Sequence, residues 1–449
     1  MFDRKYTMRL FWPVLVEQVV AVLLNFMATL MVRGVSQDAM AGVGLVGILN
    51  FLVMNAFSSV AAGVSVVVSH CIGRNDRAAA GQASSQSLVL VTYLSVAVGL
   101  GMAVCARPIL AALFGSAEAE VLSAAHTFFV YSCLSMPFLA LFSTFSGIIR
   151  ATGSTRPSMV ASVISSACYV GFGWVFINSP LDMGVAGAGL ALVVSRMVPA
   201  GLLLWLVVRR KAGIHIPFPS PKLDMAVLRP ILHIAVPSGL DSLIFNGGKL
   251  IVNVFLSGMH ASVLVASSIV NNLSSIINMP GSALQIISVT LVGQAYGKGD
   301  VPEARRQLMM LTAAAAVLQA AVSLPAFFMN DALIQIFKPD AIAFGAAQGT
   351  MLMIIVASPF LWSPSFVTAQ GLRAAGCPRF TMVVSIVSMF VLRVFGAWFF
   401  GVFLGMNLLG VWLAMLLDWA GRSLFFVPRM LNLIKSDARM KAKAARIKQ

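Results

Sequence analysis

Twelve long apolar runs, separated by short polar stretches, take up most of this 449-residue chain. Each run has roughly 20 residues or more, which is the length that an α-helix needs to cross a bilayer. In lipid, backbone groups must be satisfied by helices or closed barrels, and these runs lack the alternation of barrel strands. The residues are 59% hydrophobic and only 10% charged, which is too apolar for a soluble domain of this size. The sequence therefore predicts an all-α polytopic membrane protein.

The predicted spans form two groups of six. They lie near residues 8–32, 39–72, 84–106, 121–149, 157–178, 185–208, 230–257, 262–296, 307–329, 342–371, 380–403 and 407–430. We accordingly expect an N-terminal six-helix lobe at 1–208, a cytoplasmic linker at 209–229, a C-terminal six-helix lobe at 230–430 and a basic cytoplasmic tail at 431–449.

The two groups repeat each other at an almost constant interval of 224 or 223 residues. The matched positions are Pro13 with Pro237, Glu17 with Asp241, Gly73–Asp76 with Gly297–Asp300, Arg150 with Arg373, and Gly187 with Gly410. A constant offset indicates two copies of one structural unit. Because six is even, both copies enter the membrane from the same side, so we predict twelve transmembrane helices in two parallel six-helix repeats.

Basic residues define the orientation. Among the predicted loops and tails, those on the side of the N-terminus carry 24 Lys and Arg residues, whereas those on the opposite side carry only Arg33, Arg107 and Lys338. Cytoplasmic loops are the ones enriched in Lys and Arg, so both termini are predicted to be cytoplasmic. The net charge of +16 then reflects topology and contact with anionic membrane lipids. We expect no nucleic-acid partner, because the sequence predicts no soluble basic face.

Ionisable residues inside the predicted spans are candidates for function, because charges are costly in lipid. The candidates for binding a coupling ion or a cationic substrate are Asp241, Glu17 and Asp418, and their charge partners are Arg393, Lys249, Arg196 and Arg422. Glu17 and Arg196 are expected at a common depth, and Arg393 and Asp418, on consecutive spans, are expected to pair. Such pairs either lock helices together or take part in coupling, and the sequence leaves both alternatives open.

Asp241 is the preferred coupling residue. It follows Pro237-Ser238-Gly239, where the helix is loosened, and polar residues continue along the same span. Asn246, Asn253, Asn271, Asn272 and Asn278 lie in this span and the next, and we interpret them as candidates for lining a cavity.

The sequence lacks the motifs of nucleotide hydrolysis, metal binding and nucleophilic catalysis. The sequence has no phosphate-binding loop, no cluster of metal ligands and no nucleophile–base set. We therefore expect no catalytic residues, no metal site, no cofactor and no enzymatic activity. Energy for transport must come from an ion gradient or from the gradient of the substrate itself.

Four sequence features together resemble one known family. They are Pro237-Ser238-Gly239-Leu240-Asp241, Val292-Gly293-Gln294 before Gly297-Lys298-Gly299-Asp300, Leu372-Arg373-Ala374-Ala375-Gly376, and Gly410-Val411-Trp412 followed by Met415, Asp418, Trp419 and Arg422. Nearly the whole chain resembles the multidrug and toxic compound extrusion (MATE) family. The resemblance implies two helical bundles around a central cavity in a bacterial inner membrane, and antiport of cationic amphipathic drugs or metabolites against Na⁺ or H⁺.

The sequence departs from this family in the first repeat. The residue before Thr29 is Ala28, where many bacterial members carry Asp, and Tyr169 and Gly173 stand where the family has Asn and Asp. The resemblance therefore favours ion coupling in the second repeat, at Asp241, with Glu17 as the alternative.

Two other functions compete with ion-coupled export. One is a flippase for lipid-linked precursors, because the wider superfamily shares the two-lobe plan, and the other is a membrane protein that does not transport. The mixed charges of the second repeat and the twelve spans favour export. We expect a cationic small molecule and membrane lipids as partners, and a monomer.

Overall fold

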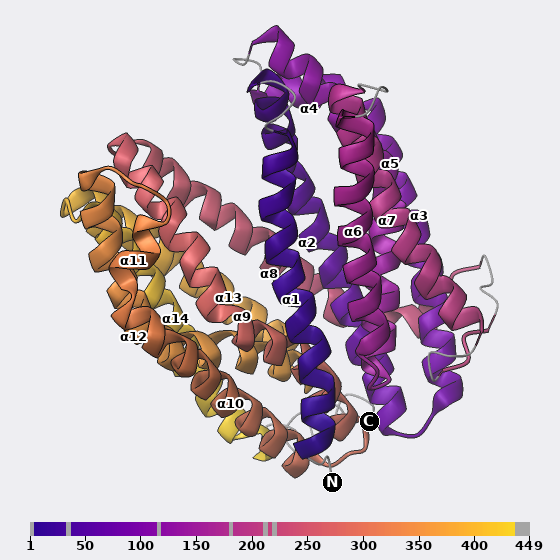
Figure 1. Cartoon of the computed structure of the whole chain (residues 1–449). Helices are drawn as coiled ribbons and strands as arrows, with labels where there is room; N and C mark the ends of the chain where they lie inside the picture. The colour runs from indigo at the N-terminus through magenta and orange to yellow at the C-terminus, as the bar shows by residue number, and fades with distance from the viewer. Residues whose placement is uncertain are drawn as a thin grey trace. The chain divides into compact units, whose positions relative to one another are not determined.

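The computed structural model describes residues 4–32, 37–114, 118–178, 183–209, 214–217 and 222–435. Within these ranges every regular element is helical (Figure 1). Twelve of the described helices are long and apolar enough to cross a membrane. The prediction of an all-α polytopic membrane protein is therefore confirmed.

Contacts between residues divide the chain into two compact units, Met1–Gly239 and Leu240–Gln449. We call these the first unit and the second unit. The division falls inside helix α8 (Met225–Ser257), later than the predicted linker. The reason is packing, since Leu228 and Ile231 at the start of α8 are fully buried in a core cluster of the first unit.

The described part of the predicted linker also packs on the first unit. Ile214 is buried in the same core cluster, and the side chain of Gln86 donates to the Lys222 carbonyl at 3.2 Å and accepts from the Asp224 amide at 2.9 Å. Linker residues 210–213 and 218–221, and residues 436–449 of the predicted tail, lie outside the described residues.

The first unit is organised around one helix, α5. Its helices are α1 (Arg4–Val32), α2 (Gln37–Gly73), α3 (Arg77–Val104), α4 (Ala106–Phe114), α5 (Ala119–Ala151), α6 (Arg156–Asn178) and α7 (Gly184–Val208). Helix α5 packs against α2, α3 and α7, and α6 packs against α1 and α7. Phe129 and Met136 of α5 are fully buried in this core, and burial of large apolar side chains stabilises the bundle.

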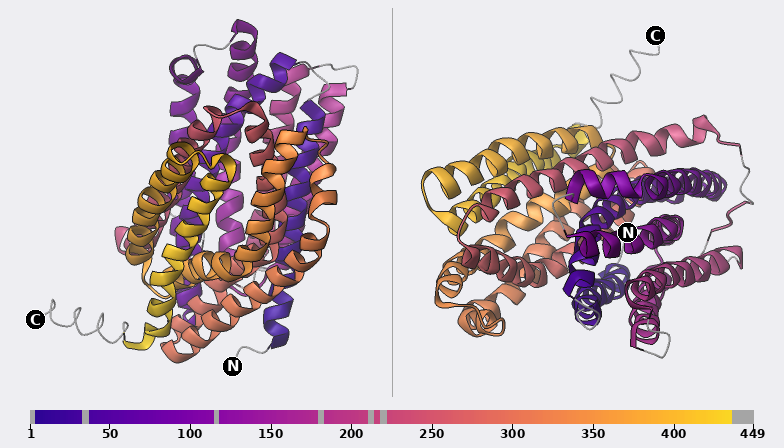
Figure 2. Two further views of the ribbon diagram at one scale, coloured as in Figure 1. Left: turned by 90° about the vertical axis from the view of Figure 1, so that its left-hand side faces the viewer. Right: turned by 90° about the horizontal axis from the view of Figure 1, so that it is seen from above.

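The second unit repeats this packing scheme. After α8 it contains α9 (Ala261–Gly297), α10 (Val301–Phe328), α11 (Asn330–Gln335), α12 (Ala341–Ala374), α13 (Pro378–Ser388), the π-helical segments η1 (Met389–Val394) and η2 (Ala397–Phe403), and α14 (Asn407–Leu431). Helix α12 packs against α9, α10 and α14, as α5 does against α2, α3 and α7. Figure 2 shows the orange and yellow helices of this unit side by side.

The loop before the third span has the same local geometry in both units. Asp76 and Asp300 cap the helices that follow, because each side chain accepts a hydrogen bond from the amide three residues on, at 2.9 and 3.0 Å. The residue before each cap, Asn75 or Gly299, has φ of 61° or 82°, which is a left-handed conformation that Asn and Gly tolerate best. The repeat seen in the sequence is therefore also a repeat in backbone conformation.

One span differs between the units. In the first unit α6 is α-helical from Arg156 to Asn178, whereas its counterpart begins as α13 and continues through η1 and η2. A π-helical turn is wider than an α-helical one and occurs frequently at functional sites. Arg393 lies in η1.

Asp340 makes a pH-dependent contribution to stability at the start of α12. Its carboxylate accepts hydrogen bonds from the Ser262 hydroxyl and the Ala343 amide, both at 2.6 Å. The Ser262 hydroxyl, followed by the Ala343 amide, lowers the pKa of Asp340 below its usual value. Because the folded-state pKa is below the unfolded one, the contribution is complete above the unfolded pKa, about pH 4, and is lost as pH falls through the folded pKa.

We expect Asp340→Ala to lower the unfolding temperature at pH 7, and the difference from wild type to shrink below about pH 4. Thermal unfolding of the purified protein in detergent, at pH 7 and at several lower values, measures this difference. Ser262→Ala should reproduce part of it. A difference that stays constant across this pH range would contradict the interpretation.

Candidate functional site

Two acid–arginine ion pairs, one in each unit, occupy repeat-related positions. In the first unit, Arg150 Nη1 lies 3.2 Å from both carboxylate oxygens of Glu17. In the second unit, Arg373 Nη2 donates to Asp241 Oδ2. All four side chains are less than a fifth exposed, so these pairs are screened less than surface salt bridges. We call them the duplicated ion pairs.

Helix ends position the two arginines. Arg150 and Arg373 lie in the last turns of α5 and α12, where a positive side chain interacts favourably with the helix dipole. Three residues later the chain turns at Gly153 and Gly376, whose φ values are 85° and 80°. Glycine adopts this left-handed conformation without steric cost and commonly follows the end of a helix. The sequence thus ends each helix just after the arginine.

Further hydrogen bonds extend the duplicated ion pairs to a third span. In the first unit, the Ser162 hydroxyl of α6 donates to Glu17 Oε1 at 3.1 Å. In the second unit, Arg373 Nε donates to the Thr381 hydroxyl of α13 at 3.3 Å, and Arg373 Nη1 donates to Gln370 at 3.1 Å. Each pair therefore connects the first, fourth and fifth spans of its unit.

This arrangement differs from the pairing expected for the first repeat. Glu17 was expected at a common depth with Arg196, but its ion pair is with Arg150. Arg196 instead donates from Nη1 to the Ser135 hydroxyl at 2.6 Å. The sequence did hold a signal for the observed pairing, since the acids and the arginines both recur at the repeat interval with opposite charge.

The second unit also contains a buried charge cluster on α8, η1 and α14. Asp418 is completely buried and accepts hydrogen bonds from Arg422 Nε at 2.9 Å and the Ser388 hydroxyl at 2.6 Å. Arg393 Nη1 lies 3.7 Å from the other Asp418 oxygen, so the predicted pair is present in the structure. Lys249 lies over the ring of Phe245, with Nζ 4.8 Å from the centroid.

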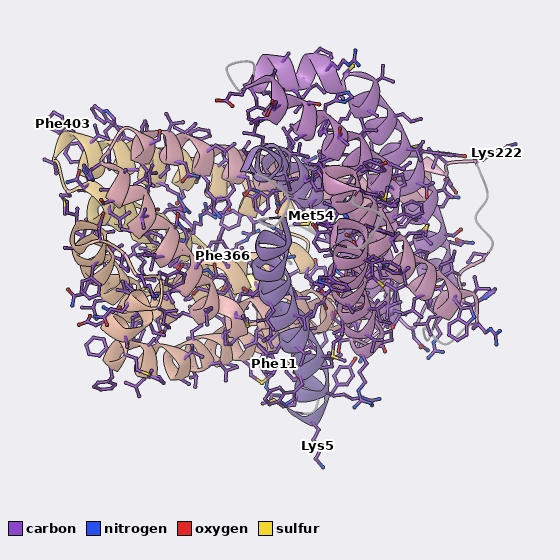
Figure 3. All side chains as sticks on the ribbon, turned by 45° about the horizontal axis from the view of Figure 1, so that its top comes forward. Lys5, Phe11, Met54, Lys222, Phe366 and Phe403 are labelled. Carbon is purple, nitrogen blue, oxygen red and sulfur yellow. The ribbon has the colours of Figure 1, made fainter. Side chains whose placement is uncertain are left out.

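The same Phe245 ring faces all three positive groups. The Cζ atoms of Arg393 and Arg422 lie 5.2 and 4.8 Å from its centroid. Phe366 makes an edge contact with Phe245, with 6.2 Å between ring centroids, and stacks on Trp362, with 4.9 Å between ring centroids. Phe366 lies among the helices of the second unit (Figure 3). The three cations thus lie close to the Phe245 ring. Each cation–π contact of this kind contributes about 0.5–2 kcal/mol.

The predicted cavity-lining asparagines have different environments. Asn246 is buried and donates to the Ser242 carbonyl at 2.7 Å. Asn278 accepts hydrogen bonds from Gln319 of α10 at 2.9 Å and Ser358 of α12 at 3.0 Å, so it joins three helices. Asn253, Asn271 and Asn272 are exposed. Only these last three are open to a solute in this structure.

Comparison with known proteins gives a consistent result. The family model described as MatE matches residues 13–175 and again residues 237–399. The uncharacterized transporter YisQ of Bacillus subtilis is 27% identical over 415 residues, which cover 91% of this chain and 90% of YisQ. The probable multidrug resistance protein NorM of Thermotoga maritima is 24% identical, with 94% and 92% coverage. A crystal structure of MATE in a bent conformation superposes with a TM-score of 0.88 at 20% identity, covering 97% of both chains.

The duplicated ion pairs lead to a stability prediction. Asp241→Asn leaves the partly buried Arg373 without its carboxylate, and we expect a loss of about 1–3 kcal/mol of unfolding free energy. The double variant Asp241→Asn/Arg373→Gln should lose less than the sum of the two single variants, because the two residues are coupled. Denaturant unfolding in detergent measures this, and Glu17 with Arg150 provides the same cycle in the first unit.

Arg306→Gln is the matched control. Its ion pair with Glu303 spans 3.7 Å, and the Arg306 side chain is 64% exposed, so its loss should change the unfolding free energy by less than about 1 kcal/mol. If Asp241→Asn cost no more than this control, the duplicated ion pairs would not hold the spans together.

Proposed function

Because the chain belongs to the MatE family, we propose that it is a secondary active antiporter that exports cationic amphipathic drugs or metabolites in exchange for Na⁺ or H⁺. Its family and its twelve candidate spans make it a multi-pass membrane transporter. The observation that carries the finer proposal is Asp241, a carboxylate inside a candidate span and only 6% exposed. Such residues mark ion and substrate pathways in membrane proteins.

Asp241 supports ion coupling because the coupling ion and Arg373 compete for its carboxylate. A cation that binds the carboxylate, or a proton that neutralises it, weakens the ion pair with Arg373. Arg373 also contacts Thr381 and Gln370, so its release changes contacts among three helices. The ion therefore binds more tightly to the arrangement of the second unit in which Arg373 has left Asp241 than to the arrangement with the ion pair. Alternating access requires such a difference in affinity between two conformations.

The remaining parts of the proposal come from the sequence. Both termini are cytoplasmic in a bacterial inner membrane, and the transporter is a monomer. The second candidate function is a flippase for lipid-linked precursors. One observation favours it, namely that Lys249, Arg393 and Arg422 gather around the Phe245 ring, since positive groups suit a phosphate.

Efflux tests the coupling proposal. We expect energised cells that express the wild-type chain to export ethidium after a Na⁺ jump or a pH jump, whichever supplies the coupling ion. Asp241→Asn should lose gradient-driven efflux because the carboxylate can no longer bind the ion. Fluorescence of ethidium-loaded cells measures the rate, and membrane expression of each variant is checked in parallel.

Asp331→Asn is the control, because Asp331 is an exposed carboxylate in α11 and should leave efflux unchanged. Gradient-driven efflux by Asp241→Asn would move coupling elsewhere, first to Glu17. If the wild type exported no cationic dye under either gradient, multidrug antiport would be wrong and the flippase candidate would gain support.

A further inference from the structure

The charge cluster of the second unit carries more positive than negative charge. Lys249, Arg393 and Arg422 gather around Phe245, and among the described residues Asp418 is the one acid that pairs with Arg393 and Arg422. Two further acids in the candidate spans of this unit, Asp241 and Glu303, are paired with Arg373 and Arg306. The cluster therefore has an excess of two positive charges inside a candidate membrane span, where unpaired charges are costly.

Two of the positive groups have unused donors. The Nε–H of Arg393 is buried and has no hydrogen-bond partner, and Arg393 is 8% exposed overall. Lys249 makes neither an ion pair nor a hydrogen bond with any described residue, and its ammonium lies over the Phe245 ring. Asp418 Oδ2, 3.7 Å from Arg393, also lacks a hydrogen bond. Because buried polar groups normally have partners, the Arg393 Nε–H and the Lys249 ammonium can each donate to a further acceptor.

The first unit shows that the scaffold does not need these charges. At the repeat interval, Lys249, Arg393, Asp418 and Arg422 correspond to Asn25, Val170, Ser195 and Pro199. The same packing scheme is therefore built without any of the four charges. The cluster also borders η1, the π-helical segment that has no counterpart in α6. The first unit has a single cation in α7, Arg196, which donates to Ser135. A costly cluster of charges confined to one of two similar units indicates function more than packing.

We propose that Lys249, Arg393 and Arg422 form a binding site for an anionic group, a carboxylate or a phosphate, of an amphipathic substrate. The anionic group neutralises the excess charge and accepts hydrogen bonds from Lys249 Nζ and Arg393 Nε. The apolar part of the substrate packs on Phe245, Phe366 and Trp362. This inference rests on the proposed transport function and deepens it, because an exported cation would then also carry a negative group and be zwitterionic.

Matched ligands test the site by binding rather than by transport. Norfloxacin carries a carboxylate and its methyl ester does not, and a polyprenyl phosphate differs from its polyprenol in the same way. We expect the purified wild-type chain in nanodiscs to bind one ligand that carries the anionic group at least about tenfold more tightly than the partner that lacks it, which is the effect of one charge-assisted hydrogen bond. Equilibrium dialysis gives the dissociation constants.

Lys249→Gln removes one positive charge and leaves the ion pairs of Asp418 intact. It should remove most of that preference without weakening binding of the partner that lacks the anionic group, and Lys249→Arg should restore it. Lys338→Gln, a change at an exposed loop residue, is the control. Preference for norfloxacin over its ester identifies a drug-like zwitterion as the substrate class, and preference for the phosphate identifies a lipid-linked substrate.

Equal binding of ligands with and without the anionic group by the wild type, or no binding of any of the four, would overturn the proposal. So would an unchanged preference in Lys249→Gln. Because the assay uses no gradient, this failure is separate from a failure of ion-driven efflux, in which the wild type would bind the ligand with the anionic group but not export ethidium.

Discussion

The second unit and the first unit both depend on an ion pair that joins helices within a low-dielectric environment. In each unit, an acid in the first span forms an ion pair with an arginine at the end of the fourth span. Each residue thereby gains a partner of opposite charge. Neither Glu17 nor Asp241 is therefore a free carboxylate in this structure. Any ion that uses one of these acids for coupling must compete with a guanidinium, which makes the strength of the pair a determinant of ion affinity.

The fold could be predicted from the sequence because its signals are long and repeated. Twelve apolar runs gave the spans, and the constant interval gave the two copies. The boundary at Gly239 could not be read in the same way. It depends on where Leu228 and Ile231 find a core, and hydropathy reports that a residue is apolar but not which unit buries it.

The site was only partly predictable. Asp241, Glu17, Asp418 and their basic neighbours stood out because charges are rare in spans. Their pairing was harder to predict, since a long arginine side chain reaches across helices from a position that looks like a loop. Arg150 and Arg373 illustrate this, because the sequence suggested a polar break whereas both lie in the last turn of a helix. The π-helical segment around Arg393 left no signal in the residue pattern.

The difference between the two units has a consequence for how such a chain can change over time. A gene that encodes the same bundle twice holds a spare copy of each position. One copy can retain the neutral residues at positions such as Val170 and Ser195, while the other accumulates charges that a single bundle could not tolerate. New ligand preferences can therefore arise by substitution in one repeat, while the other repeat keeps the residues of the shared helical bundle.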